Sequence, residues 1–327
     1  MTDPLQSLRI PLEPVDPDAG FAARLRARIA RALTLPQGVD VTVTTLEEVG
    51  AAPATAATTT STAASPGAGP ARPLGLRHGD VGHISYQVPD VDRAAAFYGH
   101  VLGWTFRTAA AGSPARPVVD TAPMVNVWPA SGVPGPMLTW RVDDLDDAVA
   151  RVRAAGGSVG AANPEPWGRM ADCVDDQGMR FGLWEPLPED RPGPAAGSSS
   201  ADEAARAAAR NGLRPGDTSY VTMEVRDSAR ARAFYGTVLG WRFHPGRVED
   251  GWGVDDPLPM VGMAGGSAAP LVVLQFRVDD IHAAVDRVRA AGGSSTDPER
   301  YPYGWAAECT DDQGIRFYLG QMAPGAG

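Results

Sequence analysis

The first informative pattern is an alternation of apolar and polar residues along the middle of the chain. Because successive strand residues point to opposite faces, this alternation predicts short strands at 83–88, 104–107, 124–128, 137–142, 171–174 and 180–184. Apolar residues at helical spacing predict a helix that begins after Asp90 and ends at Gly103. They predict a second helix after Asp143 or Asp144, ending near Gly156. The predicted order is a strand, a helix and several strands, occurring twice.

The whole pattern then recurs further along the chain. The motif Phe97-Tyr98-Gly99-x-Val101-Leu102-Gly103-Trp104 returns at 234–241, and Asp175-Asp176-Gln177-Gly178 returns at 311–314. A repeat of this length is a duplicated domain, because the repeats of solenoid proteins are far shorter. The two copies can be compared position by position, and differences on a strand that faces a cleft indicate where function has been divided or lost.

The segments outside the two copies have the composition of a leader and of linkers. Apolar residues at every fourth position predict an amphipathic helix in the leader, and the stretch after it is rich in Ala, Thr, Ser and Pro. We therefore divide the chain into a leader at 1–50, a flexible linker at 51–79, a first domain at 80–186, a second linker at 187–215 and a second domain at 216–322.

Composition narrows the function classes. The 327 residues carry a formal net charge of −10 and no basic stripe, so nucleic acid is not an expected partner. We see no membrane-spanning segment and no secretory signal at the N-terminus. The two cysteines, Cys173 and Cys309, occupy equivalent positions in separate copies, so we expect buried, reduced thiols and a cytoplasmic protein.

The repeated motifs resemble those of the vicinal oxygen chelate superfamily, which includes glyoxalase I, extradiol dioxygenases, and fosfomycin and bleomycin resistance proteins. The resemblance is carried by 83–90, 97–104, 141–144 and 175–181 and by their counterparts in the second copy. It implies an α+β fold of two tandem domains, each a pair of βαβββ halves that form a curved sheet shaped like a cup. Pairing of the two domains within the chain is compatible with this fold.

The resemblance also implies where a divalent metal ion would bind, and the residues there are unsuitable. The metal enzymes of the superfamily take one ligand from the first strand, one from the strand that opens the second half and a carboxylate from the last strand. In the first copy these positions hold His83, Met137 and Gly182. In the second copy they hold Tyr220, Val273 and Tyr318. One plausible ligand among six positions cannot hold Zn, Fe, Mn or Mg. We therefore predict no metal and no cofactor.

Strand alternation predicts which side chains line each cup. The first cup is expected to present polar and aromatic residues together with one arginine: His83, Ser85, Gln87, Trp128, Met137, Thr139, Arg180, Gly182 and Trp184, with Asn126 also on its wall. The second cup is expected to present Tyr220, Thr222, Glu224, Val273, Gln275, Arg316, Tyr318 and Gly320. Such mixtures are typical of small-ligand pockets. The alternative for both arginines is an ion pair with the Asp-Asp turns, and the alternative for His83 is a hydrogen bond within its strand.

These residues lead to three hypotheses. The favoured one is metal-free binding of an organic small molecule, of the sequestration or resistance type. The alternative is an enzyme, either a cofactor-independent lyase or isomerase with Glu224, His83 and Tyr318 as catalytic groups, or a glyoxalase-like enzyme with unusual metal ligands. The third is a structural module whose leader helix docks a partner protein. We expect the first cup to take the bulkier part of the ligand, because Gly182 is small.

Overall fold

The computed structural model of the protein describes residues 75–108, 113–188, 206, 212 and 214–323. The predicted leader helix and most of both predicted linkers lie outside these residues. The first copy contains two helices, α2 (Val91–Leu102) and α3 (Leu145–Ala154), and seven strands: β1 (Val81–Val88), β2 (Arg116–Pro117), β3 (Met124–Pro129), β4 (Gly135–Arg141), β5 (Ser158–Glu165), β6 (Gly168–Val174) and β7 (Arg180–Pro186).

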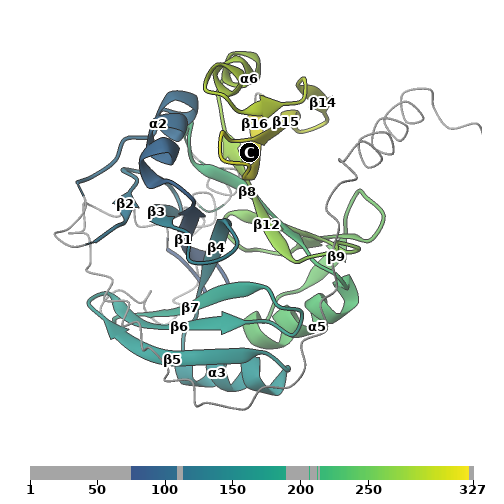
Figure 1. Cartoon of the computed structure of the whole chain (residues 1–327). Helices are drawn as coiled ribbons and strands as arrows, with labels where there is room; N and C mark the ends of the chain where they lie inside the picture. The colour runs from purple at the N-terminus through teal and green to yellow at the C-terminus, as the bar shows by residue number, and fades with distance from the viewer. Residues whose placement is uncertain (1–74, 109–112, 189–205, 207–211, 213, 324–327) are drawn as a thin grey trace, which may run out of the picture. The chain divides into compact units, whose positions relative to one another are not determined.

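The second copy repeats this arrangement (Figure 1). Its helices are α5 (Ser228–Leu239) and α6 (Ile281–Ala290), and its strands are β8 (Thr218–Glu224), β9 (Phe243–Pro245), β10 (Gly251–Val254), β11 (Met260–Ala264), β12 (Leu271–Arg277), β13 (Ser294–Ser295), β14 (Glu299–Tyr301), β15 (Gly304–Thr310) and β16 (Arg316–Met322). None of the helices in the described part of the chain is long and apolar enough to cross a membrane. The predicted α+β fold of two tandem units of similar element order is therefore confirmed.

Local sequence sets the helix ends as predicted, but one predicted strand does not form. The Asp90 carboxylate caps α2 by accepting hydrogen bonds from two backbone amides, and Gly103 ends the helix with a φ of 71°. The predicted strand at 104–107 is reduced to a single bridge between Phe106 and Val118. The hydrophobic residues there pack into the core instead of pairing with a neighbouring strand: Trp104 is 6% exposed, and Phe106 packs against the same cluster.

Each copy forms one mixed sheet. The strand order is β2-β3-β1-β4-β7-β6-β5 in the first copy and β13-β15-β16-β12-β8-β11-β10-β9 in the second, with β14 paired to β15. In the first sheet β1 joins the two halves, because it pairs in parallel with β3 and antiparallel with β4. In the second sheet β8 does the same between β11 and β12. The residues of these central strands therefore lie at the middle of each sheet.

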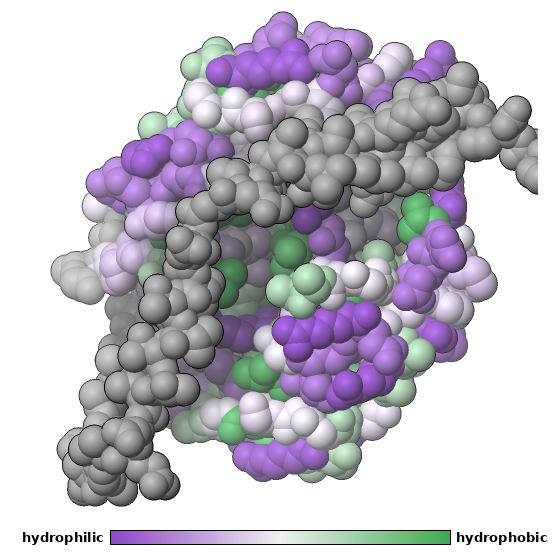
Figure 2. All heavy atoms as spheres, turned by 45° about the vertical axis from the view of Figure 1, so that its right-hand side comes forward, coloured by the Kyte–Doolittle hydropathy of each residue, from purple (hydrophilic) through white to green (hydrophobic). Residues whose placement is uncertain are grey.

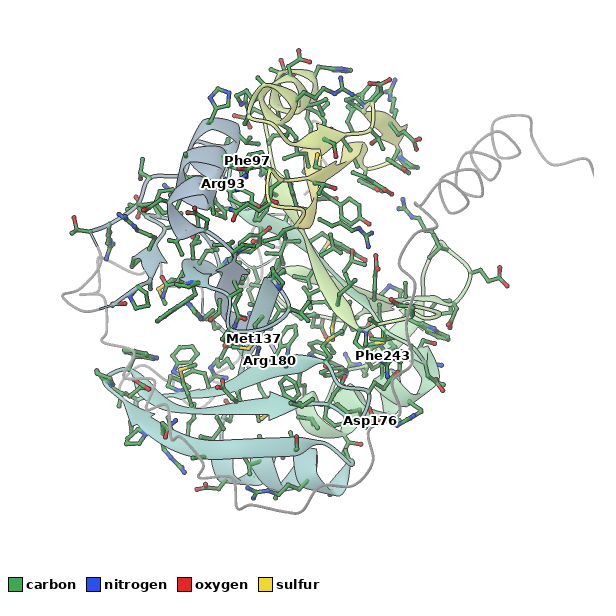
Figure 3. All side chains as sticks on the ribbon, viewed as in Figure 1. Arg93, Phe97, Met137, Asp176, Arg180 and Phe243 are labelled. Carbon is green, nitrogen blue, oxygen red and sulfur yellow. The ribbon has the colours of Figure 1, made fainter. Side chains whose placement is uncertain are left out.

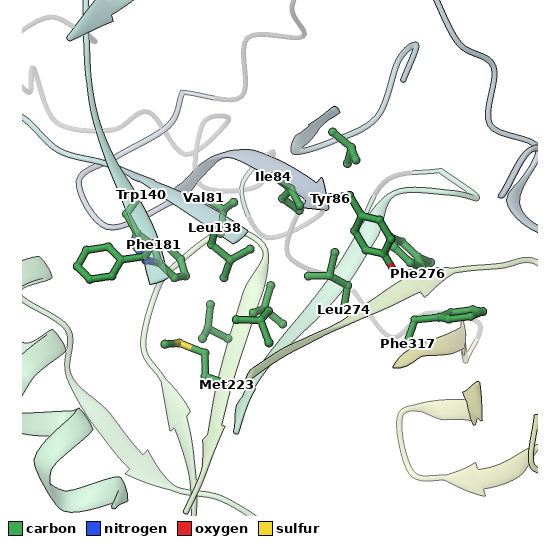
Figure 4. Packing of buried hydrophobic residues seen from close by; sticks show 14 of the residues in the cluster. Val81, Ile84, Tyr86, Leu138, Trp140, Phe181, Met223, Leu274, Phe276 and Phe317 are labelled. Atoms are coloured by element: carbon green, nitrogen blue, oxygen red, sulfur yellow. The ribbon is translucent and has the colours of Figure 1, made fainter. Parts of the chain in front are cut away.

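One face of each sheet contributes to a single hydrophobic core that includes both copies. Tyr86 on β1 and Phe276 on β12 contact each other with ring centroids 6.4 Å apart (Figure 4). Trp140 and Trp241 meet edge to face at 4.8 Å. Burial of these large side chains supplies the main driving force for holding the copies together. The visible surface is mainly hydrophilic, and hydrophobic residues on it are isolated or lie in a hollow (Figure 2).

The cysteines are part of this core. Cys173 and Cys309 are free and buried, as predicted from their equivalent positions. Burial raises the pKa of the Cys173 thiol to about 12 and that of the Cys309 thiol to about 11. Neither sulfur is a reactive thiolate at neutral pH, because the charged form is disfavoured in an apolar environment.

The duplicated motifs meet across the boundary between the copies. The Gln177 side chain accepts a hydrogen bond from the Asp227 amide at 2.8 Å and donates one to the Asp227 carbonyl at 2.9 Å. Gln313 makes the same pair of bonds with Asp90, at 2.7 and 3.0 Å. Each Asp-Asp-Gln-Gly turn therefore holds the N-terminus of the first helix of the opposite copy.

A second reciprocal contact is buried beneath these turns. The Tyr98 hydroxyl donates to the Asp311 carboxylate at 3.0 Å, and the Tyr235 hydroxyl donates to the Asp175 carboxylate at 3.1 Å. Two backbone amides also donate to each carboxylate. Burial raises the pKa of both carboxyl groups, and these hydrogen bonds oppose that rise by stabilising the charged forms. We call this set of contacts the reciprocal clamp.

Exposed ion pairs surround the clamp in the same symmetric way. The Arg93 guanidinium lies 2.9 Å from the Asp312 carboxylate, and the Arg230 guanidinium lies 2.8 Å from that of Asp176. Arg93 and Phe97 lie on the side of α2 next to the second copy (Figure 3), where the Phe97 ring meets Phe317 at 6.1 Å. The first helix of each copy therefore packs against the last strand of the other.

The two copies allow a matched test of the clamp. Tyr98→Phe and Tyr235→Phe each remove one hydroxyl that donates to a buried carboxylate, so each should lower the free energy of unfolding by about 1.5–3 kcal/mol. Tyr98→Phe should cost more, because the buried Tyr86 hydroxyl lies 2.6 Å from Tyr98 and would lose that partner. The second copy has Met223 at the position of Tyr86.

Urea denaturation at neutral pH measures this difference. The double variant Tyr86→Phe/Tyr98→Phe should recover part of the loss, because it leaves no buried hydroxyl unpaired. Equal destabilisation by the two single variants would show that the Tyr86 hydroxyl does not depend on the clamp.

Candidate functional site

The face of each sheet opposite the shared core carries the residues that the sequence singled out. On β1 the residues Ile84 and Tyr86 are fully buried in the core, so His83, Ser85 and Gln87 point to the other face. We call this face of the first sheet the first cup. It also carries residues from β3, β4 and β7: Asn126, Trp128, Met137, Thr139, Arg180, Gly182 and Trp184. The corresponding face of the second sheet is the second cup.

Within the part of the chain that the structure describes, four buried polar atoms of the first cup have no hydrogen-bond partner. They are His83 Nε2, Asn126 Oδ1, Trp128 Nε1 and Thr139 Oγ1. They come from three neighbouring strands, since His83 lies opposite Thr139 and Ser85 lies opposite Asn126. Thr139 is 1% exposed and Asn126 is 7% exposed. Because a buried polar group without a partner costs about 1–3 kcal/mol, this cluster is suited to a ligand that supplies the missing bonds.

The His83 imidazole is neutral in this environment. Burial lowers its pKa from 6.5 to about 4. At neutral pH one ring nitrogen therefore donates a hydrogen bond and the other accepts one. A neutral imidazole with this pKa is a weak base, so the geometry favours a hydrogen-bonding role for His83 over general base catalysis.

The rest of the first cup combines aromatic surface with one cation. The Trp184 indole packs on the backbone of Gly82, and its Nε1 donates to the Trp167 carbonyl at 3.1 Å. Trp128 and Trp184 are both partly exposed. Arg180 is exposed and lies next to Met137, where β4 and β7 run side by side (Figure 3). Within the described ranges no ion pair or hydrogen bond engages the Arg180 guanidinium, so the structure does not support the alternative of an ion pair with an Asp-Asp turn.

The space beside Gly182 is occupied, contrary to expectation. A Cβ atom at Gly182 would lie 2.7 Å from Thr139 Oγ1 and 3.3 Å from Thr139 Cβ. Gly182 therefore allows the Thr139 side chain to lie against β7, and it does not open volume for a bulky ligand. The sequence could not show this, because the contact depends on the parallel pairing of Thr139 with Gly182.

The charged groups of the second cup pair with each other. The Arg316 guanidinium donates to both carboxylate oxygens of Glu224, at 3.1 and 2.9 Å, and lies 3.4 Å from the Tyr318 hydroxyl. The hydrogen bonds to Glu224 raise the pKa of Arg316. The structure does not support the alternative pairing of Arg316 with an Asp-Asp turn either, because its guanidinium binds the Glu224 carboxylate on β8. A carboxylate held in this way is poorly placed to act as the general base proposed for Glu224.

The remaining residues of the second cup are also engaged. Gln275 Nε2 donates to the Ser219 hydroxyl at 3.1 Å, a partner that sequence reasoning missed. The Tyr220 hydroxyl covers Gly262, the position that Asn126 holds in the first copy. Burial raises the pKa of both Tyr220 and Tyr318, so both phenols are protonated at neutral pH. Thr222 lies on the same face, between Tyr220 and Glu224.

A separate cavity of about 220 Å³ lies away from both cups and is lined in part by Asp80, Arg206 and Trp241. Its charged groups are already paired. The Arg206 guanidinium lies 2.8 Å from the Asp80 carboxylate, which is 1% exposed. Asp80 also accepts a hydrogen bond from the Leu258 amide of the second copy at 2.9 Å. This cavity therefore reflects how the copies are joined and is not the candidate site.

A metal ion of the kind that the fold implies does not fit these residues. Met137, Gly182 and Val273 lack hard oxygen or nitrogen donors, and the two tyrosines at the remaining positions are protonated. In the part of the chain that the structure describes, no three His, Cys, Asp or Glu residues gather in a way that could hold a metal ion. We derive no chemical step through a metal.

Two tandem units, each with two helices, one mixed sheet, a core face and an opposite face that carries polar and aromatic residues, define the structural class of this protein. The family comparison agrees with this class. Residues 80–183 match the Glyoxalase/Bleomycin resistance protein/Dioxygenase superfamily, and residues 220–320 match a glyoxalase-like domain. The matches together span more than half of the chain, and the chain belongs to this superfamily.

Solved structures with the same fold are distant in sequence. The 2,3-dioxygenase LapB from Pseudomonas sp. KL28 has 15% sequence identity and a TM-score of 0.55, over 76% of this chain and 94% of that one. The Mn(II)-bound glyoxalase from Novosphingobium aromaticivorans has 15% identity and a TM-score of 0.54, over 75% and 82%. Homoprotocatechuate 2,3-dioxygenase from Arthrobacter globiformis has 14% identity and a TM-score of 0.53, over 77% and 84%. No curated protein matches the sequence. These likenesses establish the fold alone.

The buried His83 should make stability depend on pH. Its pKa is about 4 in the folded state and near 6.5 in the unfolded state, so the unfolded chain binds more protons between these values. The resulting stability is present above pH 6.5 and is lost as the pH falls towards 4. His83→Gln should abolish this contribution, about 2–3 kcal/mol over that interval.

Urea denaturation of both proteins at several pH values isolates the effect, because other titrating groups are shared. The stability of wild type relative to His83→Gln should decrease from pH 7 to pH 4. A pH-independent difference would show that the imidazole is solvated in the folded protein.

Proposed function

We propose that this protein binds a small organic molecule in the first cup, without a resident metal ion, in a sequestration function. The observation that carries the proposal is the cluster of buried polar atoms without partners on β1, β3 and β4. Trp128 and Trp184 add aromatic surface beside them, which suits a planar or apolar ligand body. These features support the binding of a small organic ligand in the first cup.

The second cup differs from the first because its charged and amide groups already have partners, and this difference favours the first cup as the ligand site. Its arginine is bound to Glu224, and its amide is bound to Ser219. A ligand would have to break these contacts before it formed its own. We therefore propose that the second copy serves mainly as a structural partner that covers the core face of the first sheet.

The enzyme hypothesis receives less support from the geometry. Of its three catalytic candidates, Glu224 is ion-paired and His83 lies on the other sheet. Tyr318 is the remaining candidate, and burial raises its pKa, which disfavours the phenolate. The groups do not converge on one place where a substrate could lie between an acid and a base.

Blocking each cup with a matched substitution tests the location. Ser85 points into the first cup, and Thr222 is its counterpart in the second cup. We expect Ser85→Trp to weaken binding of the fluorescent probe 8-anilinonaphthalene-1-sulfonate at least about tenfold, because the indole fills the space among the unpartnered atoms. Thr222→Trp should leave binding within about twofold.

Fluorescence titration gives both affinities, and circular dichroism checks that each variant folds. Loss of binding only in Thr222→Trp would assign the site to the second cup. Unchanged binding in both variants would place the probe outside the cups and contradict the proposal.

Metal analysis of purified protein tests the other part of the proposal. We expect far less than one equivalent of Zn, Fe, Mn or Ni per chain, and probe binding that does not change after dialysis against EDTA. The physical reason is the donor set, since Met137 and Gly182 offer no suitable ligand. One tightly bound ion per chain, with loss of probe binding on its removal, would contradict metal-free binding.

A further inference from the structure

The duplication provides an internal comparison for Arg180. Arg180 on β7 and Arg316 on β16 occupy the same position, two residues before the position where the superfamily places its metal-binding carboxylate. Arg316 binds a carboxylate with both ends of its guanidinium. Arg180 has no such partner among the residues that the structure describes. The Arg316 guanidinium is therefore neutralised by a carboxylate of its own copy, whereas the equivalent Arg180 guanidinium has no such partner among the described residues.

The residue that differs is the partner. The position of Glu224 on β8 is held by Gln87 on β1, and each lies at the same place in its sheet. Glu224 pairs with Leu271 at the start of β12, and Gln87 pairs with Gly135 at the start of β4. The strand that carries the arginine lies directly beyond β4 or β12 in both sheets. The strands around Arg180 are therefore arranged like those around Arg316, but Gln87 stands where Glu224 supplies the carboxylate in the second copy.

Other groups on the same face of the sheet also favour a ligand in this cup. Thr139 and Asn126 are more than nine-tenths buried and have polar atoms without partners. The guanidinium lies near the loop between β3 and β4, because a Cβ at Gly132 would be 3.7 Å from Arg180 Nη1. A bidentate carboxylate suits a planar guanidinium, and aromatic surface lies on the same face in Trp184.

We propose that the ligand of the first cup carries a carboxylate attached to an aromatic or other planar body, and that Arg180 binds this carboxylate as Arg316 binds Glu224. The inference rests on the proposed function and adds the chemical class of the ligand. Arg180 sets specificity for the anion, and the buried polar cluster with the tryptophans binds the remainder.

Matched acids and amides test this class directly. At low ionic strength, wild-type protein should bind 2-naphthoate about tenfold more tightly than 2-naphthamide, because only the acid forms the charge-assisted pair. Arg180→Gln should remove this preference and keep the weak binding of the amide. Gln87→Glu should do the same, because it installs the carboxylate that neutralises the arginine in the second copy. Arg316→Gln, the matched control, should change neither affinity by more than about twofold.

Isothermal titration calorimetry measures the affinity of each of these proteins for the acid and for the amide, and urea denaturation verifies that the variants fold. Equal binding of acid and amide, or a preference that survives Arg180→Gln, overturns the inference about the ligand. If Ser85→Trp still blocks the amide in that case, the proposed function stands. If Ser85→Trp has no effect on either probe, the site is not in the first cup and the proposed function fails as well. No binding of the acid at about 10 mM overturns the inference too.

Discussion

The reciprocal clamp is the interaction on which the rest of this structure depends. A tyrosine on the first helix of each copy donates to a buried aspartate in the last turn of the other copy, as Tyr98 does to Asp311. A buried carboxylate is unfavourable unless several donors satisfy it, so each of these aspartates needs the helix of the opposite copy. The shared core and the clamp therefore stabilise each other, and the two copies form one core.

This arrangement explains why the cups can differ. The core faces of both sheets are occupied by packing and by the clamp, so their residues are constrained in volume and in polarity. The opposite faces carry no such constraint. In the second cup, Arg316 and Glu224 neutralise each other. In the described part of the first cup, buried polar atoms such as Thr139 Oγ1 have no hydrogen-bond partner. When a duplicated domain keeps its core and changes the residues on one face, one copy can bind a ligand while the other copy supports the structure.

Membership in the superfamily determines the scaffold and leaves the chemistry open. The distant dioxygenase and glyoxalase structures share the fold at about 15% identity, and five of the six positions that correspond to the metal ligands of the superfamily hold Met137, Gly182, Tyr220, Val273 and Tyr318 in this chain. Function therefore has to be argued from the side chains on the open face. Those side chains combine a neutral imidazole, two indoles and a guanidinium that has no carboxylate partner among the described residues, a set that favours recognition of a polar aromatic molecule over acid–base chemistry.

The sequence by itself determined the duplication, the positions of the helices and their caps, and the face on which the residues of the predicted strands lie. These follow from periodicity and local hydrogen bonds, which act over a few residues. It also indicated that Met137 and Gly182 cannot bind a metal. It did not indicate β2 or β5, and the strand that it predicted at 104–107 is only a single bridge. Only the tertiary structure decided which side chains are partnered. The bond of Gln177 to Asp227, the pairing of Arg316 with Glu224 and the filling of the Gly182 space by Thr139 all join residues far apart in sequence, and strand register and domain packing set such distances.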